Sequence, residues 1–203
     1  MSEFIKAAFA ALACIAVITG CTASAHGWPD GAEELIAGSD SVMRVLTVND
    51  PADSAFLRRS CVSIPVRQLR SGTYKALERK MLATVTDPSQ DGVGIAGPQV
   101  GVGCRIVAVQ RFDKEGEPFE VYPNVRIASL GGDRVPGPEG CLSVPDAEGE
   151  VERWQDIEIC YTSPRTLRDT TETVKGFTAV IFQHECDHLD GILYTDKLCD
   201  ISE

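Results

Sequence analysis

Two histidines near the end of the chain have the spacing of a metal-binding pair. They lie in the segment HECDH, His184 to His188, and the 203-residue chain contains only one other histidine. On a helix, residues four positions apart lie on the same face, so both imidazoles can bind one metal ion. Glu185 follows the first histidine and can take a proton from water at that metal. The segment therefore predicts a metal-dependent hydrolytic site.

The pair needs a further ligand, because catalytic metal sites usually have three protein ligands and one open position. In the familiar zinc metallopeptidases with the HExxH pattern, the third ligand usually follows the helix. Here little chain remains between HECDH and Glu203. We therefore expect the third ligand upstream, and a zinc metallopeptidase is kept as an alternative.

Cys141 lies in the segment EGCLSVP, Glu139 to Pro145, and admits four interpretations. It is a buried small hydrophobic residue, half of a disulfide, a nucleophile or a metal ligand, and most free cysteines are of the first kind. The flanking residues predict a turn that leads into a strand. A third stretch, GVGIAGPQVG (Gly92 to Gly101), is a glycine-rich loop with one amide side chain, Gln99. Its glycine spacing is not that of a dinucleotide-binding fingerprint.

Together these three stretches resemble the motifs of the peptide deformylase family. That family has a GxGxAxxQxG loop, an EGCLS turn and a QHExDHLxG helix, which occur here in order as Gly92–Gly101, Glu139–Ser143 and Gln183–Gly191. The resemblance covers roughly Met43 to Asp200. It implies a hydrolase that removes the formyl group from N-formylmethionyl peptides or nascent-chain N-termini and releases formate. A non-catalytic relative that binds formyl-peptides or metal is the alternative from a different class.

The resemblance also implies how the metal is held. Cys141, His184 and His188 would bind one ion per chain, typically Fe²⁺, which is easily replaced by Zn²⁺. Such a metal makes hydroxide available near neutral pH. Glu185 would accept the proton and later return it to the departing amine.

The same resemblance implies how the substrate is held. Negative charge develops on the formyl oxygen, where the side chain of Gln99 and the backbone N–H of Leu142 would stabilise it. Gly94 and Ile95 would line the substrate cleft and let the peptide lie close, extended like an added strand. One departure bears on peptide preference: family members commonly have an Arg near Glu148, and this position is acidic here.

The predicted elements indicate an α+β fold with mainly antiparallel sheets, an early helix and a late helix. The early helical pattern runs from Gln68 to Thr86 and is ended by DPSQDG. The late helix runs from Phe177 to Leu189, carries HECDH, and has Gly191 in its C-terminal cap. Strand-like or extended stretches lie at Val42–Val48, Arg105–Gln110, Phe119–Ile127, Asp156–Pro164 and Thr171–Ala179.

The N-terminus has the features of a leader. An apolar run from Ala7 to Ile18 is shorter than the roughly 20 residues of a bilayer span and fits the core of a signal peptide. ITGC, which ends at Cys21, resembles a bacterial lipobox, whereas ASA, Ala23 to Ala25, resembles an ordinary cleavage site. We predict a leader over residues 1–25, a linker or loosely held arm over 26–41, and a deformylase-like catalytic domain over 42–203.

Charge and leader together predict partners and location. The net charge of −11 argues against a nucleic-acid partner, because a phosphate-binding surface is basic. The leader predicts an enzyme that is exported or anchored at a bacterial envelope, with membrane attachment through a lipidated Cys21. If the leader is not used, the enzyme would be cytoplasmic.

Overall fold

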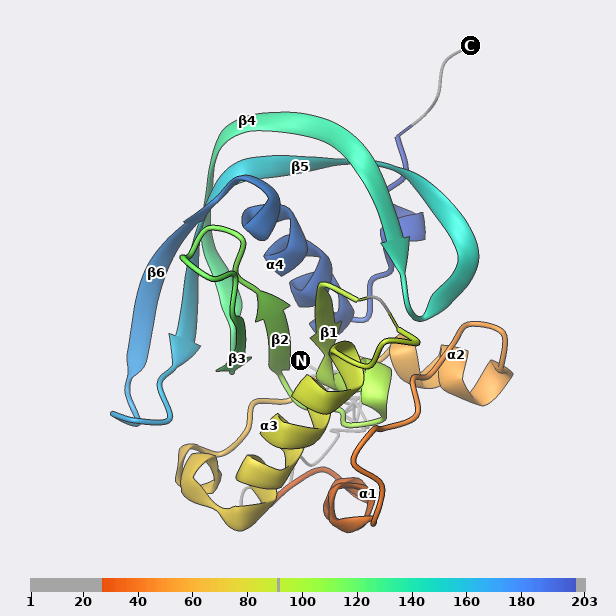
Figure 1. The fold of residues 1–203 in the computed structure, drawn as a ribbon, viewed down its shortest axis with the longest axis vertical. Helices are drawn as coiled ribbons and strands as arrows, with labels where there is room; N and C mark the ends of the chain where they lie inside the picture. Colours follow the sequence, from red (N-terminus) through yellow and green to blue (C-terminus); the bar gives the residue numbers. More distant parts are fainter. Residues whose placement is uncertain (1–26, 91, 200–203) are drawn as a thin grey trace, which may run out of the picture.

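The computed structural model describes residues 27–90 and 92–199, and its two sheets are both antiparallel (Figure 1). The first sheet has the strand order β1-β2-β3 and the second the order β4-β5-β6. The strands are β1 (Gly94–Ala96), β2 (Ile106–Gln110), β3 (Phe119–Pro123), β4 (Arg126–Cys141), β5 (Val144–Thr162) and β6 (Asp169–Lys175). The helices are α1 (Ala32–Ala37), α2 (Pro51–Leu57), α3 (Gly72–Val85) and α4 (Gly176–Leu189), with short 3-10 helices η1 (Val66–Arg70), η2 (Gly97–Val100) and η3 (Tyr194–Asp196). This architecture confirms the predicted α+β class.

The long strands β4 and β5 arch over α4, and the first sheet lies beside the same helix (Figure 1). β4 and β5 pair along most of their length, but their register shifts at three places. Bulges of this kind bend a strand and increase its twist, which accounts for the arch. The last shift lies between Gly140 and Cys141, so the ladder closes at the turn that leads into β5.

Two apolar cores fix the helices on the sheets. The first core packs α1 and α3 against the first sheet and includes Trp28, Ile36, Leu77, Met81, Ile95 and Ile106. The second packs α4 between the two sheets and includes Val107, Ile159, Val174, Phe182 and Leu189. Because α4 is covered on several sides, most of its side chains are buried, including Glu185 and His188.

The segment from Trp28 to Asp40 is not the loosely held arm that the sequence predicted. It contains α1, and the side chains of Trp28, Ala32 and Ile36 are buried in the first core. Ala32 and Ile36 are four residues apart and therefore lie on one face of α1, while Trp28 packs beside them from the segment before the helix. The Gly and acidic residues between them obscured this pattern in the sequence.

Of two further helices, one begins later than predicted and the other was not predicted. The helix expected from Gln68 begins at Gly72, because the Ser71 hydroxyl accepts a hydrogen bond from the N–H of Tyr74 at 3.0 Å and caps it. Helix α2 was missed, although Asp50 caps it and Pro51 occupies its first position, which is a recognisable start signal.

The strand predictions were right in type and wrong at some ends. The stretch expected as one strand over Phe119–Ile127 is divided at Asn124, which has a φ of 56° and separates β3 from β4. The stretch expected to continue to Ala179 ends at Lys175, and α4 begins at the next residue, Gly176. The extended segment Val42–Val48 joins no named strand.

The predicted leader, with Cys21, lies outside the described residues. Within residues 27–90 and 92–199, no helix is both long enough and apolar enough to cross a membrane.

Substitution of Gly191 tests whether close packing against Arg58 constrains the end of α4. The φ of Gly191 is 76°, and a Cβ at this position would lie 2.5 Å from the carbonyl oxygen of Arg58. A left-handed conformation costs a residue with a side chain about 1–2 kcal/mol. We expect Gly191→Ala to lower the free energy of unfolding by more than this amount, because backbone must also move.

Gly116→Ala is the matched control for this measurement. Gly116 has a φ of 77°, but nothing lies within 4 Å of the position of its Cβ. Urea unfolding of both variants should show the smaller loss for Gly116→Ala. Equal losses would mean that the contact with Arg58 does not constrain α4.

Candidate active site

The HECDH helix and the EGCLS turn meet in the structure. His184 and His188 lie on α4, and Cys141 is the last residue of β4. The Cys141 Sγ and one ring nitrogen of each histidine all lie within 4.8 Å of one another. The Cys141 Sγ is 3.2 Å from the Nε2 of His188. These three residues form the only such group of possible metal ligands among the described residues.

The two histidines lie in opposite electrostatic environments. Burial alone would lower the pKa of His184, but hydrogen bonds to Cys141 and Glu139 and the charge of Glu185 raise it to about 10. Burial holds the pKa of His188 well below its ordinary value, so this imidazole is neutral and keeps a lone pair. A raised pKa at His184 means that its surroundings stabilise positive charge, which a metal cation would also supply.

Glu139 orients His184 through a buried network of charges. Its Oε2 lies 2.8 Å from the Nδ1 of His184, which leaves the Nε2 of that ring for a metal. Arg153 donates to both oxygens of Glu139, at 2.6 and 3.0 Å, and to Asp187 at 2.6 Å. Burial alone would raise the pKa of Glu139, but the hydrogen bonds from His184 and Arg153 hold it at about 2.

Sequence reasoning missed this network. Glu139 and Asp187 lie inside the quoted motifs, and their position beside ligand residues is a signal that could have identified them. Arg153 lies in a charged stretch of β5 that has no pattern of its own, and only the fold brings it to α4.

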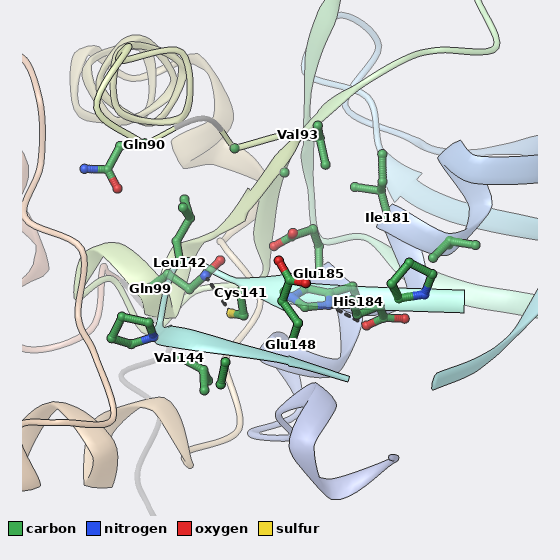
Figure 2. Close-up of a pocket in the computed structure, with 18 of the residues that line it drawn as sticks. Gln90, Val93, Gln99, Cys141, Leu142, Val144, Glu148, Ile181, His184 and Glu185 are labelled. Atoms are coloured by element: carbon green, nitrogen blue, oxygen red, sulfur yellow. Dashed lines mark hydrogen bonds and ion pairs between the residues drawn. The ribbon is translucent and has the colours of Figure 1, made fainter. Parts of the chain in front are cut away.

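Glu185, also on α4, lines the same pocket as Cys141 and His184 (Figure 2). Its side chain is buried, and its Oε2 has no hydrogen-bond partner among the described residues. Burial raises the pKa of Glu185 to about 7. The carboxylate fits here only because β1 has a glycine beside it: a Cβ at Gly94 would lie 2.5 Å from the Oε1 of Glu185.

Gln99 presents its amide to Cys141 from the glycine-rich loop. Its Oε1 accepts a hydrogen bond from the N–H of Ala96 at 2.8 Å, which fixes the amide orientation. Its Nε2 then lies 3.6 Å from the Cys141 Sγ and 3.2 Å from the Ser143 Oγ. The stretch expected as a loop is therefore an ordered, buried turn, made of β1 and η2.

The extended segment before α2 holds two of the motifs together. The N–H of Leu46 donates to the carbonyl of Gln99 at 2.8 Å, and the N–H of Val48 donates to the carbonyl of Ser143 at 2.9 Å. One short stretch thus connects the glycine-rich turn to the turn after Cys141.

A pocket of about 780 Å³ opens beside these residues. Of the residues predicted to contact substrate, Gly94, Gln99 and Leu142 line it, together with Cys141, His184 and Glu185. Ile95 was expected there as well, but its side chain is fully buried in the first core and does not line the pocket. Neighbouring side chains of a strand point to opposite faces, so Gly94 and Ile95 cannot both face the pocket.

In the described part of the chain, no residue after the HECDH helix belongs to the group of possible metal ligands. Asp190 and Asp196 form ion pairs with Arg105 and Arg58. Cys141 forms no disulfide, and all six cysteines in the described residues are free thiols. These contacts argue against the metallopeptidase alternative, whose third ligand would follow the helix.

Substitution of Arg153 tests whether the buried network of charges stabilises the folded protein. The Arg153 side chain is 4 % exposed, and Arg153→Met would leave Glu139 with only His184, and Asp187 with only Lys197, as a charged partner among the described residues. Removing one partner of a buried ion pair costs about 3–5 kcal/mol, and we expect a loss of that size in urea unfolding.

The control is Arg134→Met, on the neighbouring strand. Arg134 pairs with Glu152 at 3.3 Å, and both side chains are about half exposed. Exposed pairs contribute roughly 0–1 kcal/mol, so this variant should unfold nearly as the parent does. A small loss for Arg153→Met would contradict a central role of the network.

Comparisons with known proteins agree on one family. Residues 42–203 match the family model described as polypeptide deformylase. A peptide deformylase from Symbiobacterium thermophilum is 41% identical over 76% of this chain and 66% of its own length. The peptide deformylase of Leptospira biflexa (strain Patoc 1 / Ames) is 33% identical over 78% of this chain and 88% of its own length.

Solved structures give the same result. A class I type b peptide deformylase from Acinetobacter baumannii superimposes with a TM-score of 0.69 at 31% identity, covering 77% of this chain and 99% of that one. A structure of the Acinetobacter enzyme bound to Met-Ala-Ser superimposes with a TM-score of 0.68. The chain therefore belongs to the peptide deformylase family and is a metal-dependent enzyme that removes the formyl group from N-formylmethionyl peptides.

Proposed function

We propose that Cys141, His184 and His188 hold one divalent metal ion per chain, Fe²⁺ or Zn²⁺. The observation that carries this proposal is the convergence of one thiol and two imidazoles within 4.8 Å. A set of one sulfur and two nitrogen ligands leaves a fourth position open, as catalytic sites require. When bound, the metal polarises the formyl carbonyl and lowers the pKa of water toward neutrality.

In this proposal Glu185 moves the proton. It accepts a proton as the oxygen of water bonds to the formyl carbon, and it returns the proton to the amine nitrogen as the C–N bond breaks. Formate and a free methionyl N-terminus are the products. The buried position supports this role, since a carboxyl group whose pKa is about 7 can both take and give a proton near neutral pH.

Two amide donors would stabilise the formyl oxygen as it gains negative charge. The Nε2 of Gln99 faces Cys141, and its orientation is fixed because the Oε1 is already bonded to Ala96. We assign the backbone N–H of Leu142, which lines the same pocket, as the second donor. Donors held in place before the reaction are worth more than donors that must reorient.

The peptide would lie along β1. Within the described residues this strand pairs with β2 alone and is the edge of its sheet, so it offers backbone groups to an extended peptide. Gly94 lets the peptide approach Glu185 closely, whereas Ile95 contributes its backbone alone.

The proposed location rests on the leader alone. The pattern over residues 1–25 supports export or anchoring at a bacterial envelope, with Cys21 as the lipidated residue. If the leader is not used, the enzyme would be cytoplasmic. Substrates would be formyl-peptides outside the cytoplasm in the first case and nascent chains in the second. The mass of the mature N-terminus distinguishes the two.

Glu185→Gln tests the proton-transfer role. This variant keeps the size of the side chain and cannot accept the proton. We expect it to retain metal and to lower formate release from formyl-Met-Ala-Ser by about 10²–10⁴-fold, the usual contribution of a general base. The full chain, purified anaerobically with its metal content measured, is the sample. Turnover near the parent rate at full metal content would rule out this role for Glu185.

Cys141→Ser tests the ligand set. A serine hydroxyl is a poor replacement for a thiolate toward Fe²⁺ or Zn²⁺, so we expect less than one metal ion per chain and a corresponding loss of formate release. Cys199→Ser is the control, since Cys199 is also a half-exposed free thiol and does not belong to the ligand group. Metal content equal to that of the parent in Cys141→Ser would refute the assignment.

A further inference from the structure

The pocket beside Cys141 has an acidic part as well as an apolar one. Its apolar lining is formed by Val93, Leu142, Phe177, Val180 and Ile181. The start of β5 contributes Asp146 and Glu148. No Lys or Arg is found among the described residues that line the pocket. Apart from His184 at the candidate metal site, the charged side chains that line this pocket in the described part of the chain are therefore all acidic.

Glu148 is brought to the metal-binding segment by the strand ladder. It pairs with Gly140, the residue before Cys141. A Cβ at Gly140 would lie 3.6 Å from the Cγ of Glu148, so the Glu148 side chain lies against this glycine. Figure 2 draws Glu148, Cys141 and His184 among the residues that line this pocket.

The carboxylates of Asp146 and Glu148 are not neutralised. Within residues 27–90 and 92–199, neither forms an ion pair or a side-chain hydrogen bond, whereas Glu139 is held by Arg153 and His184. Deeper in the same pocket, Glu185 is 3 % exposed and its Oε2 has no partner among the described residues. The pocket therefore has unpaired acceptors both at its depth and at its rim.

We propose that Glu148, together with Asp146, selects formylmethionyl peptides that carry a Lys or Arg side chain in one of the two positions after formylmethionine. This inference rests on the deformylase reaction proposed above and specifies its substrate. Successive residues of an extended peptide advance by about 3.3 Å, so these two positions lie within one long side chain of the groups at the metal site.

The physical basis is charge complementarity at an exposed rim, where both Asp146 and Glu148 are accessible to solvent. A cationic side chain is attracted to the two carboxylates, and an acidic side chain is repelled by them. The net charge of −11 acts on every cation that approaches the molecule, but Glu148 acts only on a peptide in the pocket. Replacing single carboxylates separates these two effects.

The experiment compares kcat/KM for formyl-Met-Lys-Ser, formyl-Met-Ser-Lys and their glutamate counterparts, using the metal-loaded full chain. In one of the two positions, the parent should prefer lysine over glutamate by about tenfold, as expected for unit charges at short range in a partly solvated site. Raising the salt concentration should reduce this ratio. Glu148→Gln should reduce it severalfold, and Glu148→Lys should reverse it.

Glu150→Gln is the matched control. It removes the same charge from the same strand, but Glu150 does not line the pocket. The ratio should stay at its parent value in this variant. An equal fall in Glu150→Gln and Glu148→Gln would assign the preference to net charge and overturn the proposal, as would equal rates for lysine and glutamate peptides in the parent.

A second measurement keeps this inference separate from the reaction. The affinity of the metal-loaded chain for the product peptides Met-Lys-Ser and Met-Glu-Ser, and for Met-Ser-Lys and Met-Ser-Glu, does not require turnover. Failure to release formate from any peptide would refute the proposed residue roles, while tighter binding of a lysine product that depends on Glu148 would still support the charge preference. Equal affinities in both pairs would overturn it.

Discussion

The site depends on the hydrogen bonds that the buried carboxylate of Glu139 accepts. Glu139 receives hydrogen bonds from Arg153 on β5 and from His184 on α4, while it lies itself on β4. A buried charge without partners is costly, so the three elements must come together in one relative position. Arg153 also contacts Asp187, one residue before His188, and thereby reaches α4 a second time. The contacts that join sheet to helix therefore also orient the ring that faces Cys141.

A second constraint is the lack of space around Glu185. Its carboxylate is buried against β1. A Cβ at Gly94 would lie 2.5 Å from the Oε1 of Glu185 and 2.8 Å from the Cγ2 of Ile181. Only a strand without a side chain at that point leaves room for a carboxyl group inside the fold. The lack of a side chain at Gly94 also exposes the edge of β1 to the pocket. One glycine thus serves both the burial that raises the pKa of Glu185 and the access of an extended peptide.

Much of the site could be predicted because its chemistry lies in short motifs. Cys141, His184, Glu185 and Gln99 are all found where the motifs placed them, around one pocket. What the sequence could not show depends on long-range pairing. The run that ends at Cys141 is rich in Gly and Pro and does not look like a strand, yet it forms the end of β4 because β5 pairs with it. Arg153 has no local signal at all, since its partners are distant in sequence.

The β4–β5 ladder places two carboxylates with opposite fates next to Cys141. Glu139 turns inward and is paired with Arg153 and His184, whereas Glu148, the ladder partner of Gly140, lines the pocket and has no ion-pair partner among the described residues. A register shift between Gly140 and Cys141 separates Cys141 from the regular ladder. One hairpin carries Cys141, the Glu139 that orients His184, and the acidic residues Asp146 and Glu148, so the same strand pairing positions the candidate metal site and the carboxylates that line the pocket.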